Sequence, residues 1–339
     1  MMGNLKIGSV TLTHGLLLAP MAGMTDVSFR TLCRRAGAEY VVTEMVSAKA
    51  LCFEQGQRRS KHLRTAALTL LEAEETPAAI QLFGGDPDFM AEAAALLTSG
   101  EYRGANGVRP AAIDVNMGCP VHKIVGNGEG SALMLDPERA ERIVAAMRRA
   151  TDLPLTVKIR AGFDEQHKNA PELAKRLEAA GADLICVHGR TRQQYYAPSS
   201  DNRVIAAVKA AVSIPVVGNG DLFSADDVVR MKQETGCDGV MIARGCMGNP
   251  FLFTETVARL EGRPYTPPTD RERLDTALAH AADMVARKGL RVGLAEARKH
   301  MLWYCKGLRG AAVAREALTH AESMDEIRVV FDALLENRL

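Results

Sequence analysis

The chain has 339 residues, of which 47% are hydrophobic and 24% are charged. These ordinary globular proportions exclude a disordered chain and a collagen-like repeat. With 42 basic and 41 acidic residues, the formal net charge is +1, so only local clusters of charge can indicate a nucleic-acid partner. Aromatic residues make up 5% of the chain, which argues against a base-stacking sheet as the main binding surface.

Targeting signals and metal motifs are missing from the sequence pattern. No segment reaches the roughly 18 apolar residues of a membrane span, and the start MMGNLKIGSV lacks the regions of a signal peptide. The seven cysteines are scattered, odd in number and without a C-x-x-C pair. We therefore expect a protein of the reducing cytoplasm with no disulfide framework, no metal and no membrane partner. We also expect it to be monomeric.

Eight short apolar runs alternate with helical patterns along the first 250 or so residues. Near-continuous apolar runs indicate strands buried on both faces, as in a parallel sheet. Eight such units favour a (β/α)8 TIM barrel, an α/β fold, over an open doubly wound sheet. The predicted strands are Leu16–Ala19, Tyr40–Met45, Ala79–Phe83, Ala112–Val115, Leu155–Ile159, Leu184–Val187, Ile214–Val217 and Gly239–Ile242. The clearest helices between them are Pro87–Leu97, Pro137–Ala150, Ala170–Ala180, Val204–Ala211 and Ala225–Glu234.

The pattern changes after residue 253, where no further strand is expected. Residues 263–268, Arg-Pro-Tyr-Thr-Pro-Pro, read as a linker. Helical patterns follow near 270–287, 291–305, 310–319 and 323–336. We predict a barrel domain over residues 1–255 and a smaller all-helical domain over residues 256–339.

Polar residues and glycines follow at least seven of the predicted strands at the same end. In TIM-barrel enzymes the reacting groups lie on the loops after the strands, so this clustering predicts a ligand site. The segments concerned are residues 19–24, 81–85, 114–120, 158–160, 188–191, 218–221 and 243–245.

The loops after the last two strands are the candidates for a phosphate site. Glycines such as Gly220 let backbone N–H groups approach an anion closely, and the helix expected after Ser224 adds partial positive charge. Arg244 adds a charged donor, and these two loops are the usual phosphate site of the fold. Turn glycines without a ligand are the alternative.

Lys158 and His188 belong to apolar strand runs. Burying an ammonium group alone is costly, so Lys158 must face the barrel mouth or pair with an acidic neighbour such as Asp114. The alternatives are a structural ion pair for Lys158 and a core histidine bonded to the backbone for His188.

Cys119 lies in a Gly-Cys-Pro turn directly after a strand. A free cysteine is usually a small buried hydrophobe, and that alternative stays open for the residue taken alone. A thiol of ordinary pKa is mostly protonated at neutral pH, so it can donate a proton to a developing carbanion. No helix clearly begins beside it, but His122 and Lys123 follow closely and would favour a thiolate. Asn116, in the same loop, offers an amide to a substrate.

Taken together, these segments resemble the tRNA-dihydrouridine synthase family. The most specific match is Asn-Met-Gly-Cys-Pro at residues 116–120, and the resemblance extends from about residue 12 to 254. Residues 298–304, Arg-Lys-His-Met-Leu-Trp-Tyr, resemble the helical domain of the bacterial branch, most closely its B-type enzymes. Segments 60–77 and 100–110 match poorly and are assigned no role. The other matching segments are residues 19–26, 81–84, 157–160, 188–191 and 218–221.

The resemblance implies an FMN enzyme that reduces the C5–C6 double bond of specific uridines in tRNA, with NADPH or NADH as reductant. Hydride would pass from the reduced flavin to C6, and Cys119 would protonate C5. The implied flavin contacts are Pro20, Met21 and Ala22 along the ring, and Gln81 and Lys158 at its polar edge. The implied phosphate contacts are Asn219, Gly220, Asp221, Ala243 and Arg244. Asn116, His188 and Arg190 would face the substrate base or nearby phosphates, with His188 also counted among the cofactor contacts.

Positive charge gathers near the C-terminus. Between residues 287 and 315, eight lysines and arginines stand against one acid, Glu296. A polyanion such as tRNA needs clustered positive charge, and an enzyme acting on a tucked-in uridine must extrude the base. We predict that Arg298 and Lys299 contact tRNA, with Trp303 or Tyr304 available for stacking. A solvated helix face, with Trp303 in the core, is the alternative.

Two other functions stay open at this point. A flavin barrel acting on free pyrimidines, of the dihydroorotate or dihydropyrimidine dehydrogenase type, shares the barrel and the acid–base residue but does not need a basic helical tail. A barrel-based RNA-binding or scaffold protein without turnover would not need Cys119 and Lys158.

Overall fold

The computed structural model describes residues 4–56, 64–336 and 338. Its centre is a closed barrel of eight parallel strands in which each strand pairs with its neighbours in the chain. The ring closes where β11 pairs with β3. The prediction of a TIM barrel is therefore confirmed. The strands are β3 (Leu16–Leu18), β4 (Tyr40–Val42), β6 (Ala78–Phe83), β7 (Ala112–Asn116), β8 (Leu155–Arg160), β9 (Leu184–His188), β10 (Val216–Asn219) and β11 (Gly239–Ile242).

The barrel strands are buried on both faces, as their apolar runs predict. Side chains that alternate along each strand face either the surrounding helices or the barrel interior. Leu17, Tyr40 and Met241 belong to the interior cluster. An antiparallel hairpin that the sequence pattern did not predict, β1 (Leu5–Ile7) and β2 (Val10–Leu12), contributes Leu5, Ile7 and Leu12 to the same cluster. The hairpin thus helps to fill the interior of the barrel.

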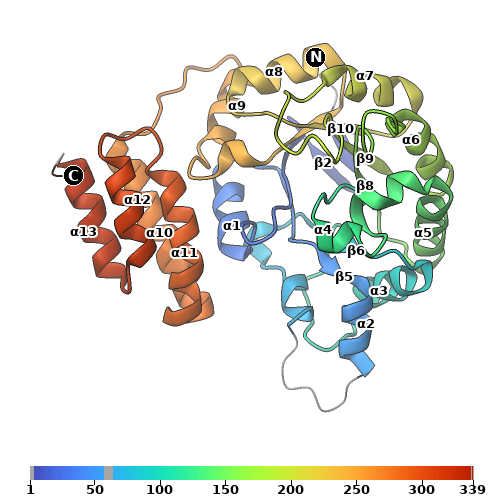
Figure 1. The fold of residues 1–339 in the computed structure, drawn as a ribbon, viewed down its shortest axis with the longest axis horizontal. Coiled ribbons are helices and arrows are strands. Elements are labelled where there is room, and N and C mark those ends of the chain that lie inside the picture. Colours follow the sequence, from blue (N-terminus) through green and yellow to red (C-terminus); the bar gives the residue numbers. More distant parts are fainter. Residues whose placement is uncertain (1–3, 57–63, 337, 339) are drawn as a thin grey trace.

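Helices surround the barrel, as Figure 1 shows. The predicted N-caps are present: the Asp136 side chain accepts from the Arg139 N–H, and Ser224 forms a capping box with Asp227. The predicted strand over residues 40–45 is shorter than expected: β4 ends at Val42, the Thr43 hydroxyl donates to the Glu44 carbonyl, and β5 (Val46–Ser47) then pairs with β6. The helices are α1 (Val27–Arg35), α2 (Ala48–Gly56), α3 (Pro87–Ser99), α4 (His122–Val125), α5 (Pro137–Ala150), α6 (Ala170–Ala179), α7 (Asn202–Ala211), α8 (Ala225–Thr235) and α9 (Leu252–Leu260).

Four helices follow the linker and lie together at one side of the barrel (Figure 1). They are α10 (Asp270–Lys288), α11 (Leu290–Tyr304), α12 (Ala311–His320) and α13 (Met324–Leu335). They share a hydrophobic core of their own, which contains Met301 and Phe331 and is separate from the core of the barrel. The predicted boundary between residues 255 and 256 lies inside α9, and the division into two domains stays a prediction.

The junction between the barrel and these helices is closely packed. Phe29 of α1 is fully buried; its ring stacks on His280 of α10, with centroids 5.6 Å apart, and lies tilted against His300 of α11 at 5.3 Å. Lys288 donates to Asp26, the N-cap of α1, and also to Glu296 at 2.6 Å. These contacts fix α11 against the barrel.

Two segments without an assigned role pack on each other. Tyr102 and Thr69 share a hydrogen bond of 2.7 Å between their hydroxyls, and Asn106 donates to the carbonyl of Leu71 at 2.7 Å. Residues 60–63 of the first segment lie outside the described residues. Within the part of the chain that the structure describes, no helix is long and apolar enough to cross a bilayer.

Candidate active site

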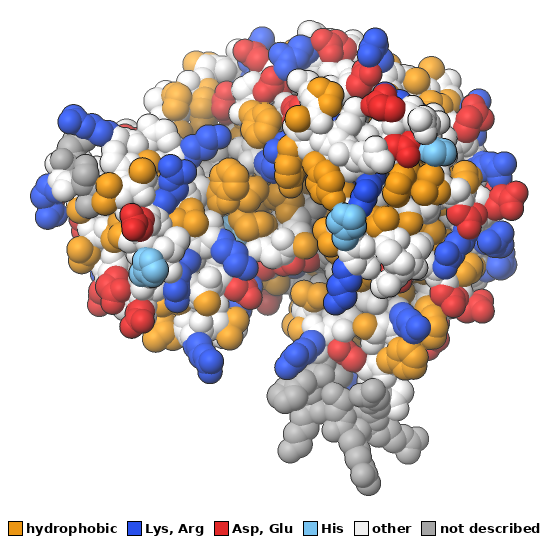
Figure 2. Space-filling view, viewed as in Figure 1, with side chains coloured by type: hydrophobic (Ala, Val, Ile, Leu, Met, Phe, Trp, Pro, Cys, Tyr) orange, Lys and Arg blue, Asp and Glu red, His pale blue; other side chains and the backbone are white. Residues whose placement is uncertain are grey.

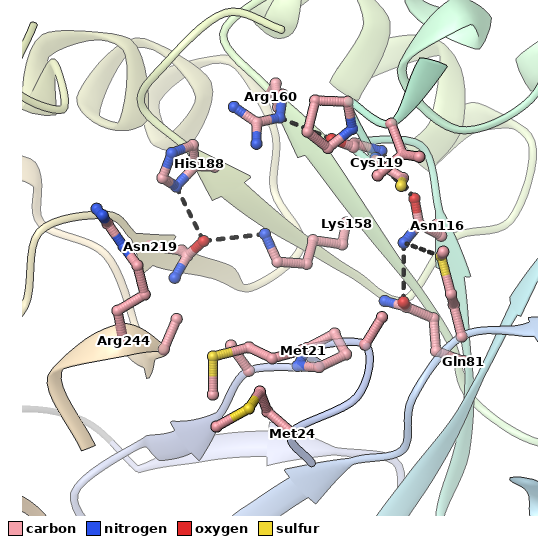
Figure 3. Close-up of a pocket in the computed structure, with 18 of the residues that line it drawn as sticks. Met21, Met24, Gln81, Asn116, Cys119, Lys158, Arg160, His188, Asn219 and Arg244 are labelled. Carbon is pink, nitrogen blue, oxygen red and sulfur yellow. Dashed lines mark hydrogen bonds between the residues drawn. The ribbon is translucent and has the colours of Figure 1, made fainter. Parts of the chain in front are cut away.

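A cavity of about 540 Å³ opens at the carboxyl ends of the barrel strands. Figure 2 shows hydrophobic side chains gathered near the centre of this face, with lysines and arginines to both sides. Figure 3 shows how the polar side chains point into the cavity from several strands. The predicted site residues that line it are Pro20, Met21, Ala22, Gln81, Asn116, Cys119, Lys158, His188, Asn219, Ala243 and Arg244.

Two amides connect β6 and β7 at the base of the cavity. Asn116 Nδ2 donates to Gln81 Oε1 at 2.8 Å, and Gln81 Nε2 donates to Asp114 Oδ2 at 2.6 Å. Asn116 Oδ1 accepts from the backbone N–H of Cys119 at 2.9 Å. Asn116 therefore holds the turn that carries the thiol.

Asn219 receives two hydrogen bonds on its side-chain oxygen. Lys158 Nζ donates at 2.9 Å, and His188 Nδ1 lies 3.0 Å away (Figure 3). Burial lowers the pKa of His188 well below its ordinary value, so the ring is neutral at pH 7. Since Asn219 Oδ1 only accepts, the ring proton is on Nδ1 and the lone pair is on Nε2. Burial also lowers the pKa of Lys158. Its hydrogen bond to Asn219 replaces the structural ion pair with Asp114 that the sequence left open.

The Cys119 thiol is buried but reaches the cavity, with 8% of the residue exposed. Burial raises the pKa of this thiol, while the backbone N–H of Val121 and the charge of Arg160 pull in the opposite direction. The net shift is upward, so the thiol keeps its proton at neutral pH. The expectation that no helix begins nearby is wrong, because the short helix α4 starts at His122.

Asp221 organises the corner next to β10. Its carboxylate accepts from Arg190 at 2.8 and 2.5 Å and from Arg244 at 3.3 Å. Gly220 and Asp221 line a small pocket that adjoins the main cavity and shares His188, Asn219 and Arg244 with it. The guanidinium of Arg244 lies over the ring of Tyr196, 4.1 Å from its centroid. Arg244 is thus held in place at the cavity by an acid and an aromatic ring.

Three predicted tRNA contacts do not line the cavity. Arg190 is 2% exposed, and it also donates to the carbonyls of Pro198 and Tyr196. Arg298 of α11 is partly buried and donates to the Thr319 carbonyl at 3.0 Å. Lys299 is exposed, and its Nζ would lie 3.9 Å from a side-chain carbon at Gly23, in the loop after β3.

The two candidate stacking residues differ. Trp303 lines the cavity, so the alternative that it belongs to the core is wrong. Tyr304 is fully buried, and its hydroxyl lies 3.4 Å from His280 Nδ1. It cannot stack on RNA, and this part of the prediction is wrong because the ring fills the core of the helical domain.

Comparison with known proteins decides the family. The dihydrouridine synthase family model matches residues 17–338. The chain belongs to the dihydrouridine synthase family. It is 43% identical over 331 residues to probable tRNA-dihydrouridine synthase 1 of Synechocystis, covering 97% of this chain and 88% of the relative. It is 38% identical over 336 residues to tRNA-dihydrouridine synthase B of Xanthomonas axonopodis pv. citri, covering 98% and 97%. The predicted family and the assignment as an enzyme are confirmed.

Two solved structures share the fold of this dihydrouridine synthase family member. Histamine dehydrogenase from Rhizobium sp. 4-9 superposes with a TM-score of 0.54 at 14% identity, covering 88% of this chain and 50% of the other. A 2-naphthoyl-CoA reductase superposes with a TM-score of 0.56 at 14% identity, covering 78% and 52%. This chain therefore spans about half the length of either protein, and the likeness concerns the barrel fold alone.

Sequence reasoning left several cavity residues out of the site of this dihydrouridine synthase. Arg160, at the end of β8, donates to the carbonyl of Gly118 at 2.6 Å and so holds the same turn as Asn116. It follows Lys158 by two residues on one strand, and this spacing places both side chains on one face. The other lining residues that the sequence analysis did not name individually are Ala19, Met24, Met45, Gly118, Pro120, Val121, Tyr195, Tyr196 and Met247.

One group of possible metal ligands lies away from the cavity. Asp26, His280 and His300 bring ligand atoms within 4.8 Å of one another at the domain junction. The Asp26 carboxylate already accepts from Lys288 and from the Phe29 N–H. The expectation that the protein holds no metal stays a prediction.

Proposed function

We propose that this chain reduces the C5–C6 double bond of uridines in tRNA to give dihydrouridine, with FMN as cofactor and NADPH or NADH as reductant. The observation that carries the proposal is a protonated thiol, Cys119, held at the mouth of a cavity that also contains Lys158, Gln81 and Asn116. The names of the relatives support tRNA as the substrate.

The residues around the cavity fit FMN. A side-chain carbon at Gly220, where φ is +132°, would lie 2.2 Å from Ser200 Oγ, so only glycine brings the backbone this close beside Arg244. Glycine backbone and a fixed guanidinium suit a phosphate. Lys158 and Gln81 offer donors to the polar edge of the flavin ring, and Met21 offers it an apolar surface. When bound and reduced, FMN supplies the hydride that adds to C6 of the uracil ring.

Cys119 supplies the matching proton. As the hydride adds to C6, the developing negative charge at C5 takes the proton from Sγ, and a thiolate remains. Arg160, whose charge acts on Cys119, stabilises that thiolate until the solvent returns a proton. Asn116 keeps the turn in place and orients the base. We propose that the neutral ring of His188 also faces the substrate and helps to orient the base.

The helical domain supports a macromolecular substrate. Trp303 of α11 lines the cavity, and Lys299 on the same helix reaches the loop after β3. We propose that residues 256–339 bind tRNA and that Trp303 contacts the flipped-out uridine or its neighbour. Arg190 and Arg298 would support this surface indirectly, through Asp221 and Thr319. A free pyrimidine would need none of these helix contacts, which disfavours a dehydrogenase of that type.

Mapping dihydrouridine in cellular tRNA tests the function. We expect one or more positions to lose dihydrouridine in cells that lack this protein and to regain it on complementation. The purified protein should absorb near 450 nm and release FMN on denaturation. An unchanged dihydrouridine map, or a colourless protein that does not bind added FMN, would contradict the proposal.

A further inference from the structure

A buried carboxylate that the proposed mechanism does not use is connected to the backbone of Cys119. Asp114 lies in the middle of β7 and is 1% exposed. It accepts from Gln81, Gln81 accepts from Asn116, and Asn116 accepts from the backbone N–H groups of Cys119 and Gly118 at 2.9 and 3.2 Å. Figure 3 shows the part of this series of hydrogen bonds that runs from Gln81 through Asn116 to the turn that carries Cys119.

The Asp114 carboxylate at one end of this series and the backbone N–H groups at the other end impose the same orientation on the two amides. An ionised carboxylate only accepts, so Gln81 must turn its NH₂ group toward Asp114 and its oxygen toward Asn116. At the other end, backbone N–H groups only donate, so Asn116 must turn its oxygen toward Cys119 and its NH₂ group toward Gln81. If either amide rotated, two donors or two acceptors would face each other in a buried place, which is costly.

We propose that Asp114 is a positioning residue for the Cys119 turn, which acts by fixing the orientation of the Gln81 and Asn116 amides. Asp114 is not among the described residues that line the main cavity, and Gln81 and Asn116 connect it to the turn. Its effect on catalysis rests on the proposed role of Cys119, but its effect on the position of the thiol does not. In this orientation, the second N–H of the Gln81 amide can donate a hydrogen bond to a carbonyl group of a ligand.

The neighbours of Asp114 allow its contribution to be separated. Thr156 donates to Oδ1 of Asp114, whereas Gln81 donates to Oδ2. The charge of Lys158 lowers the pKa of the Asp114 carboxyl group, but the hydrogen bond of Lys158 goes to Asn219. If a substitution of Asp114 affected the Cys119 turn through Lys158 and not through Gln81, its effect would therefore persist in a protein that also lacks the Gln81 amide.

A double-mutant cycle with Asp114→Leu and Gln81→Leu tests the proposal, because a leucine side chain at position 114 offers Gln81 no acceptor. The rate at which iodoacetamide alkylates Cys119 in the full-length protein, followed by mass spectrometry of its peptide, reports how firmly the turn is held. We expect each single variant to alkylate about fivefold faster, and the double variant to differ from the faster single by less than about twofold, because the second change acts on a broken chain. Cys237, buried at the opposite end of β11, is the internal reference and should not change.

Two results would overturn the proposal. One is an Asp114→Leu variant whose Cys119 alkylation rate is within twofold of that of the unchanged protein. The other is a double variant whose acceleration is the product of the single accelerations, which would mean that Asp114 acts independently of Gln81. Thr156→Val is the matched control, because it removes a bond to Asp114 and keeps the amide chain. If it accelerated alkylation as much as Asp114→Leu, general loosening of the barrel would explain the effect and the proposal would fail.

The catalytic consequence is measured separately. We expect Asp114→Leu to slow dihydrouridine formation about tenfold while the flavin is reduced at the original rate, since a misplaced proton donor slows the proton-transfer step. If the Asp114 variant formed dihydrouridine at the rate of the unchanged protein, this result would contradict the catalytic part of the inference. Full turnover in Cys119→Ala would instead contradict the proton-donor role of Cys119 in the proposed function. The result of the alkylation cycle, which concerns only how the turn is held, would still hold.

Discussion

For the single residue Cys119, burial and charge oppose each other, and burial has the larger effect. Desolvation raises the pKa of the thiol, whereas Arg160 favours the thiolate. A general acid has to hold its proton before the reaction and tolerate its loss afterwards. The buried thiol meets the first condition, and the guanidinium, which donates to the carbonyl of Gly118 in the same turn, meets the second.

Asp114 gives a prediction about the pH dependence of stability. Burial raises the pKa of its carboxyl group from 3.8 to about 6. The unfolded chain loses this proton at a lower pH than the folded protein, so the free energy of unfolding falls as the pH rises between these values. About two pKa units correspond to at most about 3 kcal/mol.

The isosteric change Asp114→Asn removes this cost of ionisation. We expect its thermal midpoint to exceed that of the unchanged protein at pH 8, and the difference to shrink as the pH falls toward 4. Calorimetry across this pH range measures both. A lower midpoint at pH 8 than in the unchanged protein would contradict the sign of the pKa shift.

Residue types identified most of the candidate site but not its internal connections. Cys119, Lys158 and Asn116 stood out because polar groups followed buried strands. The bond between Gln81 and Asp114 depends on the register of β6 against β7, which pairs these two residues. No local pattern encodes a register between residues 33 positions apart. Likewise, His122 and Lys123 suggested a thiolate because burial of the turn is not visible in the sequence.

Among the elements, α11 joins the helical domain to the cavity. Its exposed face carries Lys299 beside the loop after β3, and its last turn carries Trp303 into the cavity. One helix thus presents both a charge for the phosphate backbone and an aromatic ring near the proposed reaction site.

Lys299→Glu should weaken tRNA binding and make it less sensitive to salt. Loss of one phosphate contact lowers the slope of log K against log salt by about one. Binding measured between low and moderate salt gives this slope, and flavin reduction by NADPH should not change. Lys175→Glu, the same charge change on the barrel helix α6 where the side chain is 52% exposed, is the control. Equal effects of both variants would show that overall charge, and not the position of Lys299, matters.

The main helices and strands could be predicted because their signals are local. Continuous apolar runs gave the eight strands, and caps such as Asp136 and Ser224 gave helix starts. The hairpin β1–β2 was missed because three-residue strands carry little periodicity and its burial depends on the barrel above it. The helix α4 was missed because a single turn has no repeating pattern.

In the whole molecule, the position of the helical domain depends on a close contact at Gly248. This residue has a φ of +66°, and a side-chain carbon there would lie 2.3 Å from the carbonyl carbon of Trp303. Only glycine accommodates both the backbone conformation and the approach of α11. Nothing in the sequence around Gly248 indicates this contact, since its partner is 55 residues away.

Gly248→Ala should therefore displace the end of α11. We expect a loss of stability of about 1–3 kcal/mol and a higher KM for tRNA, because Trp303 would move from the cavity. Gly262→Ala is a matched control: φ is +67° there, but nothing lies within 4 Å of the added carbon. Thermal unfolding and steady-state kinetics compare the two. An unchanged KM in Gly248→Ala would contradict the role of this junction.

The central claim is that Cys119 delivers the proton that completes reduction of the uridine. The most direct measurement is single-turnover oxidation of the reduced Cys119→Ala enzyme by tRNA, followed at 450 nm. The account predicts that FMN and tRNA bind as before, whereas reoxidation by tRNA slows by about 10²- to 10⁴-fold. Reoxidation at the original rate, with dihydrouridine formed in the tRNA, would contradict it.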